Sequence, residues 1–214
     1  MIFRDREEAA RKLAKRLSHY RGRNPLILAV PRGAVPMGPI LADALGGSLD
    51  VVLVQKLGGP GNPELAVGSV TEDGDVTVSP FAREIGVTQE YIDREAAERL
   101  EELRARRRRY TPVREPADPA GRVVIVVDDG VATGATLSAA LRGLRKRKPA
   151  ELVAAVAVAP SETLERFRAE ADRVVCLSTP QPFFAVGQFF LSFPQVSDDE
   201  VVEILQGAAA KAPA

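Results

Sequence analysis

The chain has 214 residues, which is enough for one full hydrophobic core and a small appended subdomain. Its 29 Lys and Arg residues balance 29 Asp and Glu residues, so no overall charge favours nucleic acid or an anionic membrane. A single cysteine excludes internal disulfides, and no apolar run approaches the roughly 20 residues that cross a bilayer. With a charged amino terminus that does not resemble a signal peptide, these features predict a cytoplasmic protein without nucleic-acid or membrane partners.

The first 45 residues alternate between helix and strand patterns. Residues 5–20 place apolar side chains on one side of a helix that ends near His19, where a histidine interacts favourably with the helix dipole. Residues 26–30 predict a buried strand and residues 35–45 a helix. Between them, Pro31-Arg32-Gly33-Ala34 forms a strand-to-helix turn, whose arginine either binds phosphate through its planar fork of donors or lies exposed on a tight turn.

Residues 50–55 predict the next strand of the sheet and place Lys56 at its carboxyl end. Active sites of open parallel sheets lie beyond these ends, so Lys56 is a candidate site residue. Residues 58–63 are so rich in Gly and Pro that an exposed loop is expected. Residues 64–70 and 76–78 then predict a hairpin joined at an Asp-Gly turn.

Residues 88–110 predict a helical insertion that ends in four consecutive arginines, 106–109. The helix before them is acid-rich and carries no aromatic ladder, which disfavours a nucleic-acid interface. Cations are favourable in a last helical turn, so the main interpretation is a solvated face. The alternative is that one arginine reaches the active site of a second subunit in a homodimer.

Residues 123–136 read Val-Val-Ile-Val-Val-Asp-Asp-Gly-Val-Ala-Thr-Gly-Ala-Thr. Five apolar residues predict a strand buried on both faces, followed at its carboxyl end by two carboxylates. Two glycines and two threonines then lead into a helix, a geometry in which inward amides and a helix amino terminus bind phosphate. Carboxylates beside a phosphate site indicate a ligand that also carries hydroxyls, namely a phosphorylated sugar, usually with a divalent metal.

This strand, acid pair and Thr-Gly-x-Thr run resemble the phosphoribosyl-pyrophosphate (PRPP) motif of the type I phosphoribosyltransferases. A Walker-type P-loop would require a lysine in the loop, and an aspartyl-phosphate enzyme would space its carboxylates one residue apart, on one face of the strand. A third alternative is a turn whose acids only cap the following helix.

The resemblance implies an α/β fold with a doubly wound, mostly parallel sheet, and the further strand, helix and strand patterns up to residue 177 agree with it. The expected core covers residues 1–177, with the helical insertion at about 88–110. Residues 178–214 would form a small C-terminal hood over the sheet edge and a final helix, ending in a loose tail at 207–214. In the family, either the loop at 57–65 or the helix at 88–110 would act as a lid over PRPP.

The resemblance also implies a reaction: transfer of the 5-phosphoribosyl group from PRPP to a nitrogen nucleophile, with Mg²⁺ as cofactor and release of pyrophosphate. Arg32 and Lys56 would neutralise the leaving pyrophosphate, while Asp128 and Asp129 would hold the ribose hydroxyls and, through PRPP, the metal. The implied PRPP-binding residues are Arg32, Gly33, Ala34, Lys56, Asp128, Asp129, Gly130, Val131, Ala132, Thr133, Gly134, Ala135 and Thr136.

The acceptor is expected to be a small molecule, with Phe183 and Phe184 of the hood as its candidate contacts. Purine salvage enzymes of the family often carry an acid where this chain has Ala132, which disfavours a hypoxanthine or guanine substrate. A different class of function is a non-catalytic regulatory protein that binds PRPP or a nucleotide. The presence of Arg32 and Lys56 favours the enzyme, because a sensor of a nucleotide monophosphate needs no pyrophosphate site.

Overall fold

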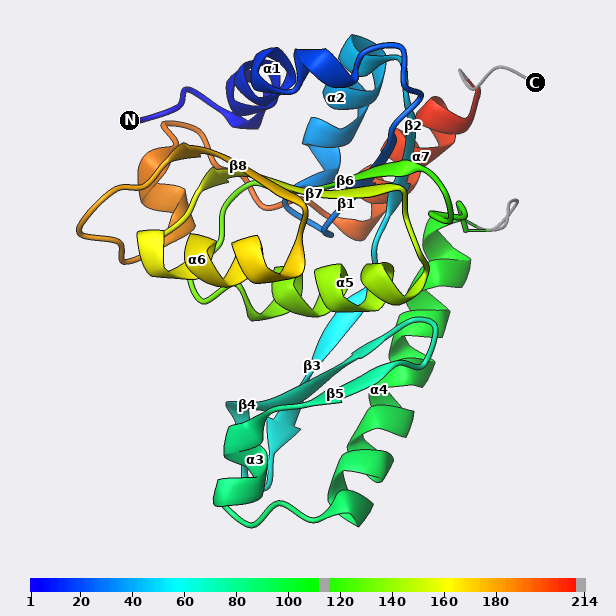
Figure 1. Ribbon diagram of the computed structural model, residues 1–214, viewed down its shortest axis with the longest axis vertical. Coiled ribbons are helices and arrows are strands. Elements are labelled where there is room, and N and C mark those ends of the chain that lie inside the picture. The colour runs from blue at the N-terminus through cyan, green and yellow to red at the C-terminus, as the bar shows by residue number, and fades with distance from the viewer. Residues whose placement is uncertain (112–115, 211–214) are drawn as a thin grey trace.

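The computed structural model describes residues 1–111 and 116–210, and within these ranges the strands form two sheets. The larger sheet is parallel throughout. Its five strands, in spatial order, are β2 (Ser48–Val51), β1 (Leu26–Ala29), β6 (Val123–Asp128), β7 (Glu151–Val158) and β8 (Arg173–Ser178). Helices α1 (Arg6–Arg16) and α2 (Gly38–Leu45) cover one face, and α5 (Ala135–Lys146) and α6 (Ser161–Glu170) cover the other (Figure 1). The predicted doubly wound parallel sheet is confirmed.

The central strand β6 shows why a continuous apolar run forms this sheet. Successive side chains of a strand point to opposite faces, and here both faces are covered by helices. Val123, Ile125 and Val127 pack into the core beneath α1 and α2, while Val124 and Val126 pack into the core beneath α5. Because β6 is central, its carboxyl end brings the two acids that follow to the middle of one sheet edge.

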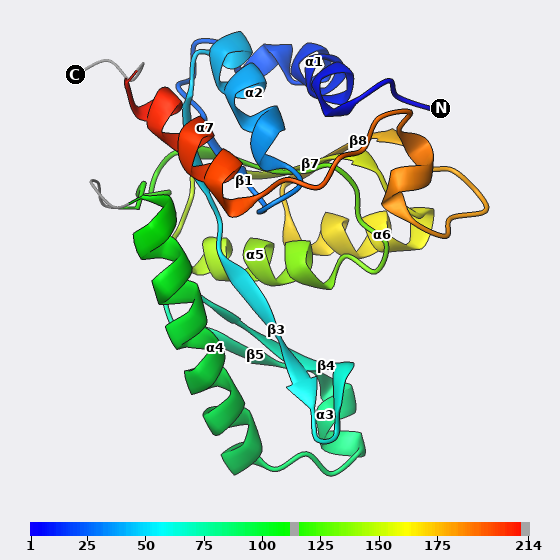
Figure 2. The same cartoon turned by 180° about the vertical axis from the view of Figure 1, so that it is seen from behind.

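The second sheet belongs to an arm, which we define as residues 54–110. Its antiparallel strands are β3 (Val54–Gly59), β4 (Asn62–Thr71) and β5 (Val76–Val78). Two helices complete the arm, α3 (Pro80–Glu84) and α4 (Gln89–Tyr110). Figures 1 and 2 show the arm extending away from the core on the side of α5. The predicted helix and hairpin are therefore present, and they form one structural unit.

Two predictions in this region were wrong. Residues 50–55 are not one strand, because β2 ends at Val51 and the chain starts β3 of the other sheet at Val54. Lys56 consequently lies within β3, opposite Ser69 of β4, and not at the end of a core strand. The expected loop at 58–63 is mostly strand as well: the register shifts at Gly58, where an added Cβ would lie 2.9 Å from Pro63 Cα, so glycine permits the close approach.

The prediction that the arginine run at the end of α4 is a solvated face was wrong for one residue, Arg107. Arg107 is largely buried, although its neighbours in the run are exposed. Its guanidinium pairs with Asp50 at 2.9 Å and with Glu72 at 2.5 Å, and it donates to the Val51 carbonyl at 2.8 Å. Since Glu72 belongs to the arm and Asp50 to β2, this cluster fastens the arm to the core.

The C-terminal segment crosses the sheet edge before helix α7 (Asp198–Ala210) packs beside the upper end of α4 (Figure 2). Residues 207–210 are helical, contrary to the expected loose tail, and residues 211–214 lie outside the described residues. His19 lies in a 3₁₀ turn, Ser18–Tyr20, because α1 already ends at Arg16, and its ring contacts that of Tyr20. No helix in the described part of the chain could span a membrane.

We expect the junction of α4 and α7 to lose stability in acid. The Tyr110 hydroxyl, which donates to Asp198 at 2.5 Å, and then the charge of Arg109 hold the pKa of Asp198 below its ordinary value of 3.8. A carboxyl whose pKa is lowered by folding stabilises the fold above pH ~3.8, and this contribution disappears as the pH falls through the lower folded value. Asp198→Asn should therefore lower the free energy of unfolding at pH 7. Below about pH 4, the free energy of unfolding of this variant should fall less steeply with pH than that of the wild type.

Urea unfolding at pH 7 and at about pH 3.5 measures this effect. Asp199→Asn is the matched control, because Asp199 is 85% exposed and bonds Arg109 from the same helical turn. An equal pH response of the two variants would contradict the role given to Asp198.

Candidate active site

The turn between β1 and α2 approaches the acid pair at the end of β6. The Pro31–Arg32 peptide bond is cis, and the amide of Ala34 donates to the Val30 carbonyl at 3.3 Å. A Cβ added to Gly33 would lie only 2.4 Å from Asp129 Oδ2. The turn therefore lies directly against the acid pair, as the sequence suggested, but the Ala34 amide is already used inside the turn.

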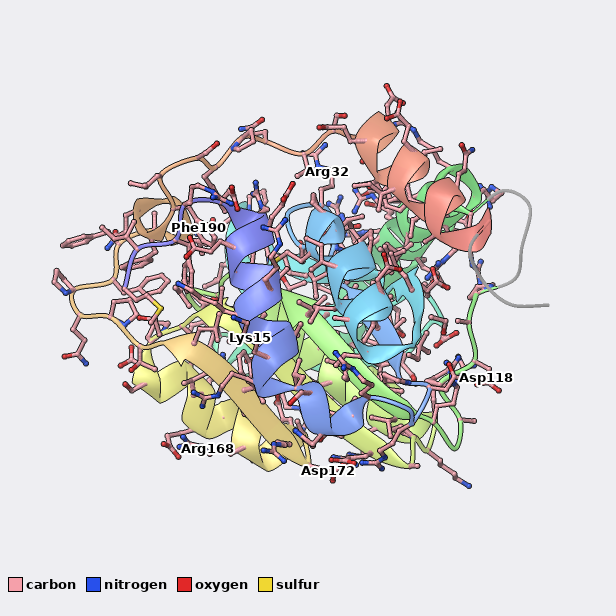
Figure 3. All side chains as sticks on the ribbon, turned by 90° about the horizontal axis from the view of Figure 1, so that it is seen from above. Lys15, Arg32, Asp118, Arg168, Asp172 and Phe190 are labelled. Atoms are coloured by element: carbon pink, nitrogen blue, oxygen red, sulfur yellow. The ribbon has the colours of Figure 1, made fainter. Side chains whose placement is uncertain are left out.

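Arg32 points away from the core, towards solvent. Figure 3 shows it at the molecular edge near the start of α7, and its guanidinium Nη1 lies 3.8 Å from Asp198 Oδ1. Its side chain is 53% exposed. A planar cation with this exposure, on a turn that touches the acid pair, can reach an anionic ligand at the sheet edge.

Asp129 is buried and paired with a cation of the protein, although the sequence analysis assigned both acids to the ligand. Arg6 of α1 donates from Nε to Asp129 Oδ2 at 2.7 Å, and both side chains are only 9% exposed. Arg6 also donates to the Pro194 carbonyl at 2.7 Å, and its guanidinium lies 3.8 Å from the centre of the Phe193 ring. Asp129 is therefore a structural centre that joins α1, the hood and the turn at Gly33.

Asp128 is the last residue of β6, and its carboxyl group lies close to that of Asp129. Burial of its carboxyl group, and then the charge of Asp129, raise the pKa of Asp128 well above the ordinary value of 3.8. The Arg6 partner thus distinguishes two acids that are equivalent in the sequence motif. Of the two acids, Asp128 is therefore the candidate for ligand binding.

The loop between β6 and α5 is held from outside by α6. Thr163 donates from its hydroxyl to the Ala132 carbonyl at 2.9 Å, and Arg166 donates to the Thr133 carbonyl. In a trans peptide the amide N–H points opposite to the carbonyl, so the amides of Thr133 and Gly134 point away from α6. They join the free first-turn amides of α5 in a site suited to a phosphate group.

Close packing requires the glycines of this loop. Gly134 adopts a left-handed φ of +69°, and a Cβ added there would lie 2.6 Å from atoms of Phe167 and Thr163. At Gly130 a Cβ would lie 2.5 Å from Val186 of the hood. The amide of Val131 donates to the Val158 carbonyl at 3.0 Å, so this predicted ligand amide is used within the fold. Thr133 and Thr136 are exposed at the loop surface.

Lys56 lies on the arm side of the same loop. A cavity of about 360 Å³ separates β4 and β5 from the first turns of α5, and Lys56 and Thr136 both line it. The structure therefore places Lys56 beside the start of α5. The two hood phenylalanines differ: Phe183 packs on Phe189 with ring centres 5.0 Å apart, whereas Phe184 is 82% exposed.

Sequence reasoning missed Arg6, yet the sequence carried a signal. Arg6 precedes Ala9, Ala10 and Leu13 by three, four and seven residues, so it belongs to the buried face of α1. A charged residue on a buried helix face requires a partner.

Comparison with known proteins agrees with these observations. Residues 3–189 match the phosphoribosyl transferase domain family. Two curated Mycobacterium tuberculosis proteins, one of them named "Putative phosphoribosyl transferase Rv0571c", are 42% identical over 208 residues, which is 97% of this chain and 47% of theirs. The chain thus spans about half the length of these relatives.

A solved structure resembles the whole chain. The crystal structure of TT1426 from Thermus thermophilus is 46% identical, covers 97% of this chain and 99% of its own, and superposes with a TM-score of 0.86. The family match covers the acid pair, both turns beside it and the arm. The chain therefore belongs to the phosphoribosyl transferase domain family.

Proposed function

We propose that the protein transfers the 5-phosphoribosyl group of PRPP to a nitrogen nucleophile and releases pyrophosphate in an Mg²⁺-dependent reaction. One observation carries the proposal: the acid pair at the end of β6 lies between a turn with an exposed arginine and a loop whose amides face a phosphate site. PRPP carries a 5-phosphate, ribose hydroxyls and a pyrophosphate in this order. These groups match the loop amides, the acid pair and the exposed arginine, respectively.

Each group then has a role in the displacement. The acceptor nitrogen forms a bond to C1 of the ribose as the bond from C1 to the pyrophosphate oxygen breaks. Positive charge builds on the ribose ring, where the Asp128 carboxylate opposes it and accepts from the ribose hydroxyls. Arg32 stabilises the negative charge on the leaving pyrophosphate. The amides of Thr133 and Gly134 and the first turn of α5 hold the 5-phosphate.

The residues present suit Mg²⁺, which prefers carboxylate and phosphate oxygens and commonly takes most of its ligands from the substrate. Asp128 and the oxygens of PRPP would hold the ion, and when bound it would neutralise charge on the pyrophosphate. Asp129, paired with Arg6, acts as a positioning residue for the turn at Gly33.

Lys56 receives a different role from the one expected at the leaving group. Because it lies beside Thr136, we place its charge on the 5-phosphate side of the donor. The acceptor contacts stay with Phe183 and Phe184 at the hood, and the arm is the candidate lid. A homodimer remains a prediction.

The direct test is release of pyrophosphate from PRPP with Mg²⁺ across a panel of nucleobases and amines. We expect at least one acceptor to give turnover that is abolished by removing Mg²⁺ with a chelator. PRPP binding without turnover on any acceptor would instead favour the regulatory protein.

Gly33→Ala tests the contact between the turn and the acid pair. The added Cβ would lie 2.4 Å from Asp129 Oδ2, and Arg6 keeps that carboxylate from moving away, so the turn must shift. PRPP affinity should fall at least about tenfold, or roughly 1.4 kcal/mol. Calorimetric titration with PRPP measures the loss. Gly207→Ala is the control, since no atom lies within 4 Å of a Cβ there and its affinity should equal that of the wild type.

A further inference from the structure

The cavity between the arm and α5, which we call the arm cavity, is larger than a site for the 5-phosphate alone requires. Its volume of about 360 Å³ lies within the range of roughly 300–1,000 Å³ that is typical of small-molecule sites. It is lined along α5 from Ala135 to Arg142, and the seven helical steps between these residues span about 10 Å. The arm cavity therefore begins at the phosphate loop and continues well beyond it.

The charge of the arm cavity is positive. Lys56, Arg142 and Arg166 line it from three different elements, and no carboxylate is among the described residues that line it. Arg142 pairs with Glu170 behind the wall at 2.7 Å. The three cationic side chains border a partly enclosed space, an arrangement that attracts anions.

The polar groups of the wall are also held in place. Glu170 accepts from the Ser138 hydroxyl at 2.5 Å as well as from Arg142, so these two residues of α5 are fixed relative to each other. The Nε atom of Arg142 is buried and has no hydrogen-bond partner among the described residues. Arg166 donates to the Thr133 carbonyl, which is neutral and leaves the charge of the arginine available to a ligand.

We propose that the arm cavity binds a second phosphate group, beside and in addition to the 5-phosphate held by the loop. Lys56 from β3 and Arg142 from α5 are the principal cations of this site. The phosphate has two chemical sources: it is either joined to the 5-phosphate of the ribose donor, as in a 5-diphosphate, or it belongs to a separate anion. The proposal rests on the proposed function only in placing the 5-phosphate at the loop. Neither Arg32 nor Asp128 lines the arm cavity, so this site is distinct from the one proposed for the leaving pyrophosphate.

Thermal unfolding of the full chain with inorganic phosphate tests the site, because a ligand that binds only the folded state raises the midpoint as its concentration exceeds the dissociation constant. The titration is made with saturating ribose 5-phosphate, which occupies the loop, and at constant ionic strength. We expect a further rise of the midpoint, which grows with the logarithm of the phosphate concentration once this exceeds the dissociation constant. It should be lost in Lys56→Gln and in Arg142→Gln, with Arg145→Gln as control, since Arg145 is on α5 but pairs with Asp172 outside the cavity.

ADP-ribose, whose terminal ribose carries a 5-diphosphate, distinguishes the two sources. Binding at least about tenfold tighter than ribose 5-phosphate, with loss of the response to phosphate, supports the joined phosphate. Equal binding with the phosphate response retained supports the separate anion. The proposal is overturned if phosphate gives no rise of the midpoint beyond that of ribose 5-phosphate, or if the rise in both cavity variants equals that of the wild type. Failure of ribose 5-phosphate to bind would count against the proposed function, while the cavity variants would still test the second phosphate.

Discussion

Replacing Arg6 by Met should lower the free energy of unfolding by about 3 to 5 kcal/mol, one of the largest single-residue effects expected in this chain. The substitution removes the guanidinium that donates to Asp129 at 2.7 Å and leaves that carboxylate buried without its partner. It also removes the donor to the Pro194 carbonyl and the cation over the Phe193 ring. One change therefore detaches α1 and the hood from the acid pair together.

Urea unfolding measures the loss, and Arg11→Met on the same helix is the matched control. Arg11 is 55% exposed and pairs with Glu7 one turn away, so its replacement should cost about 0.5 kcal/mol or less. Replacing both members of the buried pair, Arg6→Met with Asp129→Leu, should recover part of the stability, because no buried charge then lacks a partner. Equal costs for Arg6→Met and Arg11→Met would show that the pair does not stabilise the fold.

The parallel sheet and the glycine-containing loop between β6 and α5 were predictable because they depend on neighbouring residues. The apolar run at 123–127 requires burial on both faces, and the glycines at 130 and 134 follow within one turn. The cap of α4 was equally local: Thr88 accepts from the Tyr91 amide, three residues on.

The arm was not predictable to the same extent because a strand pattern does not say which sheet a strand joins. Residues 50–55 keep a β pattern across the point where the chain leaves one sheet for the other. The pairing of Lys56 with Ser69 assigns β3 to the arm, and the ion pairs of Arg107 with Asp50 and Glu72 are among the contacts that fix the arm on the core. Those contacts join residues that are distant in sequence, and their energies come from packing and not from local propensity.

Contacts between residues distant in sequence also distinguish the two acids, which are equivalent in the sequence motif. Asp129 faces Arg6, a residue 123 positions away in the chain, whereas Asp128 carries a raised pKa beside the phosphate loop. A carboxyl whose pKa is raised by folding destabilises the folded state at neutral pH, so Asp128 costs stability. Retaining such a group at a sheet edge is characteristic of a functional site.

Asp128→Asn should therefore weaken PRPP binding about a hundredfold without lowering the free energy of unfolding. Two charge-assisted hydrogen bonds to ribose hydroxyls would be weakened, a loss of about 3 kcal/mol, while the substitution relieves the repulsion from Asp129. Asp129→Asn should instead lower the stability by several kcal/mol, about as much as Arg6→Met does, because it leaves Arg6 buried and unpaired. Calorimetric titration with PRPP and Mg²⁺, beside urea unfolding of both variants, separates the two effects. Two outcomes would contradict these separate roles of Asp128 in ligand binding and Asp129 in stability. One is an equal loss of stability in the two variants, and the other is wild-type PRPP affinity in Asp128→Asn.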